Sequence, residues 1–270
     1  AKLTATSGIT NTGTINISTA NIGGNVTNTN GIINITGAGT LEYGITNGTV
    51  NLNVGETYMT SDLFHNIALV TGGGSINTQN NDSLNSYSLG AVTLNSDMAL
   101  KIDVDAKNLN ADKFTGTADA TGSKNILLAI KIYTTGQSGK IANVFDSHLR
   151  NKVSFNEEEY TVGNYTYNVV YDSTDGSLNF YNANLYAAVH DSRAERTYTI
   201  RTDGDNGGEN VNTNLGIMEG GILTVEGANK PVNGKGFEGI VIRSGKTLNI
   251  NNVSSWNGFS STGDNGALKL

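Results

Sequence analysis

Residues 13–54 read "GTINISTANIGGNVTNTNGIINITGAGTLEYGITNGTVNLNV". Three phrases within this stretch are nearly alike, and they occupy residues 13–17 (GTINI), 31–35 (GIINI) and 48–52 (GTVNL). In each phrase a glycine comes first, and apolar side chains then alternate with Thr or Asn, which is the period of a strand with one buried face. Short strands at such regular spacing allow a sandwich, a barrel or a β-solenoid. Because the phrases resemble one another and self-similar coils stack like on like, the pattern favours the solenoid.

The asparagines of these phrases fall at matching positions. Asn16 and Asn34, for example, are each the fourth residue of a phrase. If successive phrases stack as coils, side-chain amides at such positions lie one above another and can form hydrogen-bonded ladders. The sequence therefore predicts asparagine ladders between coils.

The composition describes an ordered, strand-rich chain of one large domain or two ordinary ones. The chain has 270 residues, of which 34 are glycine, one is proline and none is cysteine. Disordered chains carry few β-branched residues and a high net charge, whereas Ile, Val and Thr are abundant here and charged residues make up only 15%. The absence of cysteine excludes a disulfide scaffold and a thiolate metal site. It also fits bacterial surface proteins.

The charge balance excludes two classes of partner. The formal net charge is −7 at pH 7 and the sequence pI is about 4.9. A nucleic-acid binder needs a basic face to neutralise phosphates, and an anionic bilayer attracts basic segments. We therefore expect neither nucleic acid nor an anionic bilayer as a partner. The sequence also has no apolar run of membrane-spanning length and no signal peptide, so we expect no direct membrane insertion of this segment. Because the chain begins already in the repeat pattern, we expect it to be a piece of a longer protein.

The pattern divides the chain into three regions. We expect β-helix coils over residues 1–90, an irregular β region or insertion over 91–186, and a connector followed by further coils over 187–270. Within the middle region, residues 160–182 predict a hairpin with Asp175-Gly176 in its turn. A short helix or a connector is expected near residues 183–196, where Ala, Leu, Glu and Arg cluster.

The last coils carry a recognisable set of motifs. Residues 239–242 read Gly-Ile-Val-Ile, residues 244–250 read Ser-Gly-Lys-Thr-Leu-Asn-Ile, residues 252–253 read Asn-Val, and residues 266–267 read Gly-Ala. This succession resembles the passenger regions of bacterial autotransporters and related surface β-helix adhesin-like proteins, which use type V secretion. The resemblance covers the two repeat regions and, more loosely, the middle one. It implies a right-handed parallel β-helix, all-β in class.

The resemblance also implies a function. A passenger of this kind is exported across the outer membrane to the bacterial cell surface or released outside the cell. We expect a non-catalytic, rigid stalk that acts in adhesion, self-association or both, with binding in the irregular parts, chiefly residues 142–175 and the loops near 202–215. The expected partners are a protein or glycan of a host or neighbouring cell surface, or another copy of the chain. A subunit of a surface layer or filament is a further alternative, because uncapped coil edges promote association.

An enzyme on the same fold is the main alternative from another class. Right-handed β-helices include polysaccharide hydrolases and lyases. Asp103 and Asp105 are two apart on a predicted strand, so their carboxylates would lie about 7 Å apart on one face, near the lower limit for an inverting glycosidase. The other interpretation is that both face solvent while Ile102 and Val104 face the core. No nucleophile and no other catalytic residue is assigned.

Two further groups are candidate binding sites. Residues 202–210 read "TDGDNGGEN", where Asp203, Asp205, Asn206 and Glu209 offer the oxygen ligands that Ca²⁺ prefers, although the EF-hand register is absent and an exposed acidic turn is the alternative. No other cofactor is expected.

The second group is aromatic. Tyr165, Tyr167 and Tyr171 share one face of a predicted strand, and Trp256 falls in a predicted turn. All four could stack on sugars or on a protein partner, while cross-strand packing explains the tyrosines without a ligand.

Overall fold

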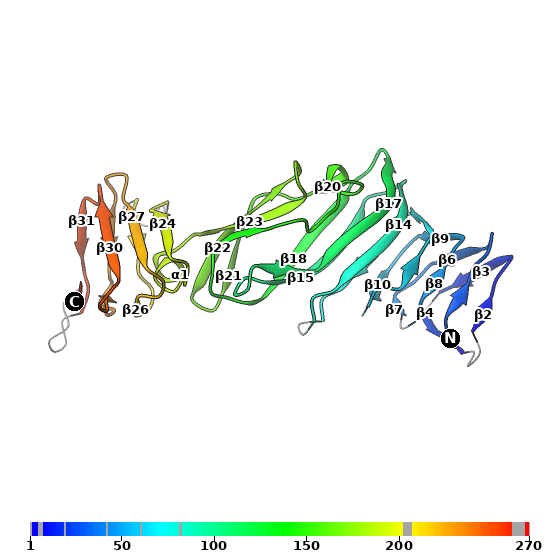
Figure 1. Cartoon of the computed structure of the whole chain (residues 1–270), viewed down its shortest axis with the longest axis horizontal. Helices are drawn as coiled ribbons and strands as arrows, with labels where there is room; N and C mark the ends of the chain where they lie inside the picture. Colours follow the sequence, from blue (N-terminus) through cyan, green and yellow to red (C-terminus); the bar gives the residue numbers. More distant parts are fainter. Residues whose placement is uncertain are drawn as a thin grey trace.

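The protein is all-β and elongated, with its first and last strands at opposite ends (Figure 1). The computed structural model describes residues 2–4, 8–18, 20–41, 43–59, 61–80, 83–201, 207–260 and 268–269. The α-helical content of these residues is one short helix, α1 (Leu185–Val189), and η1 (Arg150–Lys152) is a single 3₁₀ turn. No helix in these ranges is long and apolar enough to span a membrane.

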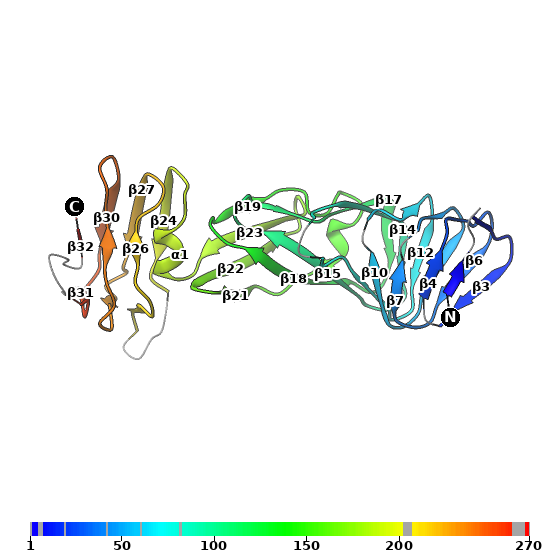
Figure 2. The ribbon, with the colours of Figure 1, turned by 90° about the horizontal axis from the view of Figure 1, so that it is seen from below.

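Three parallel sheets form the first half of the molecule, which we call the N-terminal stack. The first sheet contains β1 (Lys2–Thr4), β4 (Ala20–Gly23), β7 (Gly39–Leu41), β10 (Glu56–Met59), β13 (Ser75–Asn77), β15 (Met98–Asp105), β18 (Ile126–Thr134) and β20 (Val153–Ser154), with β16 (Asn110–Ala111) antiparallel to β15. The second contains β2 (Ile9–Thr10), β5 (Val26–Thr27), β8 (Ile45–Thr46) and β11 (Phe64–His65). The third contains β3 (Thr14–Ile17), β6 (Ile32–Ile35), β9 (Thr49–Leu52), β12 (Ala68–Thr71), β14 (Ser86–Leu94) and β17 (Lys113–Gly122). From β1 to β12 the chain visits the three sheets in turn (Figure 2), and each strand from β1 to β10 pairs with the strand three places further along.

The repeated phrases pair in register, like residue on like. Ile33 on β6 lies between Ile15 on β3 and Val50 on β9, and its side chain is completely buried. On the opposite face, the Asn34 amide donates to Asn16 Oδ1 at 2.7 Å. Asn51 donates in the same way to Asn34 Oδ1, also at 2.7 Å. These bonds confirm the predicted asparagine ladders.

A second ladder runs through the turns, where the backbone is left-handed. Asn47 and Asn66 have φ values of 63° and 52°, and the Asn66 amide donates to Asn47 Oδ1 at 2.7 Å. Asparagine tolerates this conformation because its short side chain bonds locally. Gly48, with φ +68°, comes next, and a Cβ there would overlap the carbonyl oxygen of Asn28 in the preceding pass of the chain. Gly48 thus permits both the left-handed turn and the close approach of successive passes of the chain.

The strands lengthen from β14 onward, and aromatic rings continue the stack there. Phe114 lies between Tyr87 and Phe145, with ring centroids 5.3 and 5.5 Å away and nearly parallel planes. Phe145 in turn meets the edge of Tyr171 at 5.9 Å. Tyr171 belongs to an antiparallel sheet, so this row of rings joins the parallel sheets to the next part of the molecule.

That antiparallel sheet contains β19 (Gly139–Ile141), β23 (Ser177–Asn182), β22 (Tyr165–Asp172) and β21 (Glu158–Val162), in this order. Its strands β22 and β23 form a hairpin in which Asp172 pairs with Ser177. Gly176 takes a φ of +72° in the intervening turn. The predicted hairpin is therefore confirmed.

A second set of three parallel sheets, which we call the C-terminal stack, follows α1. Its sheets are β24 (Glu195–Thr199), β27 (Ile222–Glu226) and β30 (Thr247–Asn251); β25 (Glu209–Asn210), β28 (Pro231–Asn233) and β31 (Ser255–Asn257); and β26 (Gly216–Ile217), β29 (Ile240–Val241) and β32 (Leu268–Lys269). The buried apolar side chains form two clusters, one from Ile17 to Phe180 and one from Leu185 to Ile242. Helix α1 belongs to the second cluster, and the expected helix near 183–196 is thus present but short.

Candidate functional site

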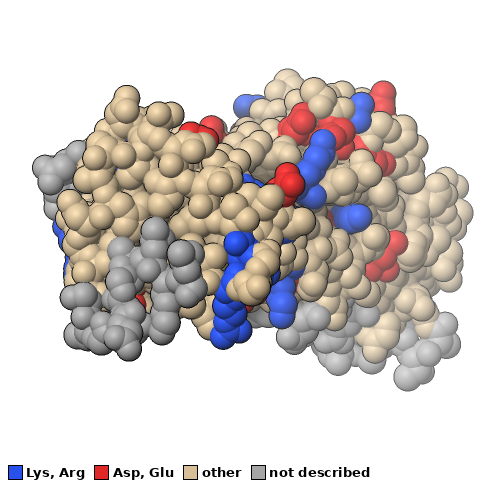
Figure 3. Space-filling model, turned by 60° about the vertical axis from the view of Figure 1, so that its left-hand side comes forward, with Lys and Arg blue, Asp and Glu red and all other residues tan. Residues whose placement is uncertain are grey.

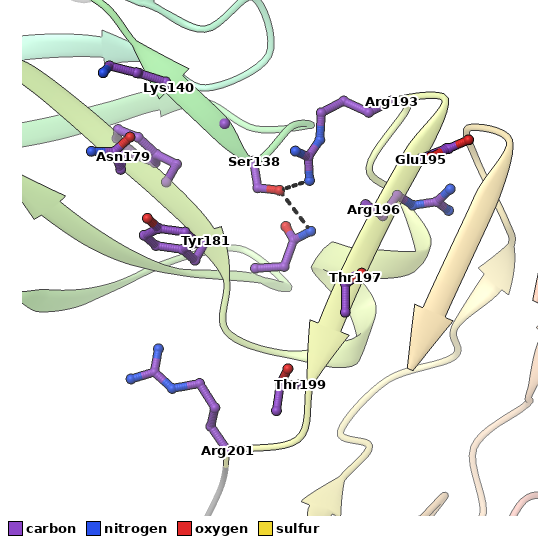
Figure 4. Close-up of a pocket in the computed structure, with 13 residues that line it drawn as sticks. Ser138, Lys140, Asn179, Tyr181, Arg193, Glu195, Arg196, Thr197, Thr199 and Arg201 are labelled. Carbon is purple, nitrogen blue, oxygen red and sulfur yellow. Dashed lines mark hydrogen bonds between the residues drawn. The ribbon is translucent and has the colours of Figure 1, made fainter. Parts of the chain in front are cut away.

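A groove of about 530 Å³ lies where the antiparallel sheet meets the C-terminal stack. One wall comes from β19 and β23, the other from β24, and the connector between α1 and β24 closes one end (Figure 4). The side chains that line it include Ser138, Lys140, Asn179, Tyr181, Arg193, Glu195, Arg196, Thr197, Thr199 and Arg201. Four of these are Lys or Arg and one is Glu, so the lining is positive in a chain whose net charge is −7. We call this site the basic groove.

The walls follow from strand alternation. On β23, Leu178 and Phe180 are buried in the core, and Asn179 and Tyr181 therefore point outward. On β24, Arg196 and Tyr198 are buried, and Thr197 and Thr199 are exposed. The two outward rows face the same hollow (Figure 4).

A buried polar cluster joins the two walls at one end of the groove. Asp191 is completely buried and its Oδ2 accepts from Ser138 Oγ at 2.7 Å, from Asn182 Nδ2 at 3.0 Å and from Arg193 Nη2 at 2.8 Å. Burial acts to raise the pKa of Asp191, but the bonds from Arg193, Asn182 and Ser138 together outweigh it and lower the pKa. Asp191 is therefore held ionised, and it ties the antiparallel sheet to the chain that enters the C-terminal stack.

Arg196 is a wall residue with a structural role. Its guanidinium is buried and donates to the carbonyl oxygens of Ala188, Val189, Glu219 and Ile222, at 2.8 to 3.3 Å. Two of these carbonyls belong to the C-terminal end of α1, where a cation is favourable. Burial lowers the pKa of Arg196, and no carboxylate pairs directly with it among the described residues. Its charge consequently adds to the positive potential behind the groove.

The remaining cations of the lining have exposed partners. Lys140 pairs with Asp175, and both side chains are more than a third exposed. Arg201 Nη2 lies 3.6 Å from Glu157 Oε1, with both side chains about half exposed. Such pairs contribute little to stability and exchange readily. On the face shown in Figure 3, Lys and Arg side chains gather near the middle.

A second, smaller groove of about 360 Å³ lies along β25 and the residues after it. Half of its lining residues are Asn or Thr, and the others include Tyr186, Glu159 and Glu209. Glu209 is buried, accepts from the backbone N–H of Leu185 at 3.1 Å and bonds the Tyr198 hydroxyl. Burial raises the pKa of Glu209 despite these two bonds. Its carboxylate thus anchors the first residue of α1 to the stack.

This position bears on the predicted calcium site. Glu209 uses one carboxylate oxygen for Leu185 and the other for Tyr198. The other three predicted ligands, Asp203, Asp205 and Asn206, lie outside the described residues. Among the residues that are described, no group of three His, Cys, Asp or Glu side chains could hold a metal ion. A Ca²⁺ site at these residues stays a prediction.

Asp103 and Asp105 occupy neither of the two environments expected for them. Both are buried, at 0% and 7% exposure, because residues 78–80 and 110–112 cover their face of β15. Asp103 Oδ2 accepts from the Asn80 N–H at 2.6 Å. The expectation that both side chains face solvent is therefore wrong. Neither lines the two grooves, so nothing in their placement indicates a catalytic pair.

Asp105 in particular stabilises a turn. Its Oδ1 accepts from the backbone N–H groups of Lys107 and Asn108, each at 3.0 Å, and from the Thr134 hydroxyl. Burial acts to raise the pKa of Asp105, and the bonds from Thr134, Asn108 and Lys107 outweigh it and lower the pKa. A carboxylate held in this way stabilises the turn and directs no free oxygen at solvent.

The tyrosines of β22 pack mainly against the protein itself. Tyr167 is completely buried and its hydroxyl accepts from the Gly136 N–H at 2.9 Å, which corrects the prediction that it could stack on a ligand. Tyr165 is half-buried between Tyr167 and Tyr186, at centroid distances of 6.1 and 5.2 Å. Tyr171 donates to the Arg150 carbonyl at 2.9 Å. Packing, the alternative interpretation, accounts for all three contacts.

Trp256 lies on strand β31, and the expectation of a turn there is wrong. It pairs with Val232 of β28 and stacks on Phe259 at a centroid distance of 5.7 Å. The ring is partly exposed. Ligand binding by Trp256 stays a prediction.

The basic groove itself was missed from the sequence. Its residues come from segments near 138–140, 179–182 and 193–201, which nothing in the sequence places together. One signal was present: Arg193, Arg196 and Arg201 lie within nine residues of an otherwise acidic chain.

Comparison with known proteins found no matching family model, no matching curated protein and no matching solved structure.

Proposed function

We propose that the chain is part of a bacterial cell-surface or secreted protein of the passenger type, which acts without catalysis in adhesion, self-association or both. The parallel sheets would be two runs of a right-handed β-helix, and the whole would be a rigid stalk that holds a binding region away from the cell. The proposal places the protein outside the outer membrane, with a protein or glycan of another cell, or a second copy, as partner.

The order of strands supports the β-helix. From β1 to β12, each pass of the chain contributes one strand to each of three parallel sheets, and like residues stack on like. Asparagine ladders connect these passes on the outside. Stiffness in such a stack comes from many similar contacts between neighbours, which suits a stalk.

The observation that carries the binding role is the position of the basic groove. It lies where the regular stacking is interrupted, and three of its lining residues, Ser138, Asn182 and Arg193, are held by bonds to the buried Asp191. Exposed side chains on a rigid support are the usual form of a recognition site. Residues 1–90, which form most of the N-terminal stack, carry only five charged side chains and are suited to support.

The test is a binding and sizing experiment on the purified chain. We expect saturable retention on at least one glycan or matrix protein in an immobilised panel, or a sedimentation coefficient that rises with concentration. Absence of both results would overturn the proposal. The Asp191→Asn variant tests the role of the groove, because the joint is weakened in it and retention through the groove should fall.

The alternative of a polysaccharide hydrolase or lyase is tested in the same preparation. Asp103 and Asp105 would have to be released from their backbone bonds to act. Release of reducing ends or unsaturated products from a panel of polysaccharides, lost in Asp103→Asn, would establish that alternative and overturn a non-catalytic role. Formation of ordered sheets or fibres visible by electron microscopy would instead favour a surface-layer or filament subunit.

A further inference from the structure

We propose that the basic groove binds an oligosaccharide that carries a carboxylate. The proposal rests on the adhesive function above, and it names the site and the chemical class of the ligand. A groove of about 530 Å³ is within the range of sites for small ligands.

Tyr181 supplies a flat apolar face. The residue is 53% exposed, among the most exposed of the large apolar residues, although both of its neighbours on β23 are buried. The ring lies at the groove beside Asn179 (Figure 4). An exposed aromatic ring next to planar amides and hydroxyls offers one apolar surface and several hydrogen bonds, which is what a sugar ring with an apolar face and hydroxyl rims requires.

Thr197 and Thr199 supply the hydrogen bonds of the opposite wall. Their side chains line the groove from β24 (Figure 4). β24 pairs only with β27 among the described strands, through bonds such as Ile222 N–H to Ala194 O and Ile200 N–H to Glu226 O. By the alternation of a parallel ladder, the main-chain groups of Thr197 and Thr199 are directed to the opposite, unpaired edge. This edge offers further donors and acceptors for sugar hydroxyls.

Arg201 supplies the charge for a carboxylate. Its guanidinium is about half exposed and its separation from Glu157, 3.6 Å, is longer than a hydrogen bond. A ligand carboxylate can therefore replace Glu157 and form the bidentate pair that arginine favours. Arg193 cannot serve in this way, because three of its donors are taken by Asp191 and Ser138.

The same features disfavour other anions and an added peptide strand. A polyanion such as a phosphate chain requires several free cations, whereas Arg193 and Arg196 are engaged by Asp191 and by backbone carbonyls, and only Lys140 and Arg201 of the described lining have exposed partners. An extended peptide would have to pair along β24, whose edge begins at Glu195 and is followed by Arg201, and charged residues at an edge oppose strand addition.

The experiment is a titration of the intact chain that is monitored by calorimetry and by nuclear magnetic resonance. The probes are trigalacturonate and 3′-sialyllactose, which distinguish a uronate from a sialate source, with lactose and maltotriose as neutral controls. We expect saturable binding of at least one acidic probe with a Kd below about 1 mM, and binding of the neutral probes at least about tenfold weaker.

Three variants locate the site. Tyr181→Ala should weaken binding of the acidic probe about tenfold or more, and Arg201→Gln should abolish the preference for acidic over neutral probes. Glu157→Gln removes the competitor of Arg201 and should tighten binding, a gain that no structural damage would produce. Tyr43→Ala and Arg243→Gln, at exposed positions in the two stacks, are the matched controls and should leave binding unchanged.

The outcomes separate this inference from the proposed function. If the chain adheres to cells but binds no acidic saccharide, or binds one with no response to the three variants, the groove assignment is overturned and the adhesive function stands. If an acidic peptide binds with the Arg201 dependence and the saccharides do not, the ligand class is overturned. Tighter binding in Glu157→Gln together with loss in Tyr181→Ala supports the assignment.

Discussion

Arg193 and Asp191 form an ion pair whose carboxylate is completely buried while the guanidinium side remains one third exposed. The arginine binds both carboxylate oxygens, with Nε 3.1 Å from each and Nη2 2.8 Å from Oδ2. Ser138 and Asn182 complete the shell of donors around Oδ2. The pair therefore connects three segments, and its loss should loosen the joint between the antiparallel sheet and the C-terminal stack.

Asp191→Asn is expected to lower the free energy of unfolding of the joint by about 2 kcal/mol, less than for a fully buried pair because Arg193 is partly exposed to solvent. Hydrogen exchange of the amides of residues 138–141 and 191–199 measures this directly. Glu159→Gln, which changes an exposed carboxylate of the antiparallel sheet, is the matched control. Equal protection in the two variants would show that Asp191 does not hold the joint.

The Gly48→Ala substitution tests the turn of the repeated phrase. Gly48 has φ +68°, and its added Cβ would meet the Asn28 carbonyl oxygen. Gly163 has a similar φ of +59° with no atom within 4 Å of the added Cβ. Gly163→Ala should therefore cost only the backbone strain, about 1 kcal/mol, whereas Gly48→Ala should cost about 3 kcal/mol or more. Urea denaturation monitored by circular dichroism compares the two variants, and equal midpoints would contradict the close approach of Gly48 to Asn28.

The stacking of residues 31–35 on 13–17 could be predicted because the interaction is a repetition in sequence. Equal phrases place equal side chains at equal heights, so Ile33 on Ile15 and Asn34 on Asn16 follow from the pattern. The strand at Trp256 was missed for a related reason. Its short strand is defined by parallel pairing with Val232, 24 residues earlier, and its own alternation is too brief to show it.

The site was less accessible to prediction than the fold. Asp103 is buried because residues near Asn80, which precede β15 in the sequence, and residues near Asp112, which follow it, both fold over this strand. The basic groove likewise combines Tyr181 with Thr199 across a change from antiparallel to parallel sheets. Contacts of this kind depend on tertiary packing, and no local period encodes them.

The Phe114→Ala substitution tests the row of aromatic rings. Phe114 is 1% exposed and stacks between Tyr87 and Phe145. Its removal leaves a cavity in the N-terminal stack and should cost about 3–5 kcal/mol, while Phe114→Leu should cost about half as much. Circular dichroism should report the change. Trp256, the sole tryptophan, packs against the other apolar cluster, so its fluorescence should change less. Phe237→Ala, an exposed ring, is the control.

Acidification should destabilise the C-terminal stack through His190. The ring lies 4.2 Å from Tyr186, centroid to centroid, and its Nε2 is 2.9 Å from the Leu215 carbonyl oxygen. Burial lowers the pKa of His190 below 6.5, although the bond to Leu215 acts in the opposite direction.

The folded chain therefore takes up the His190 proton at lower pH than the unfolded chain. Stability is fully present above the unfolded pKa near 6.5 and declines as the pH falls from there toward the folded pKa, by at most about 1.4 kcal/mol per pH unit. Denaturation followed by Trp256 fluorescence at pH 7.5 and 5.5 measures the decline. Glu209 has a raised pKa and so contributes to the pH dependence of stability with the opposite sign, but this contribution is the same in the unmodified chain and in the histidine variants. His190→Gln should flatten the pH profile, and His65→Gln, at an exposed position, should leave it unchanged. An unaltered profile in His190→Gln would show that another group is responsible.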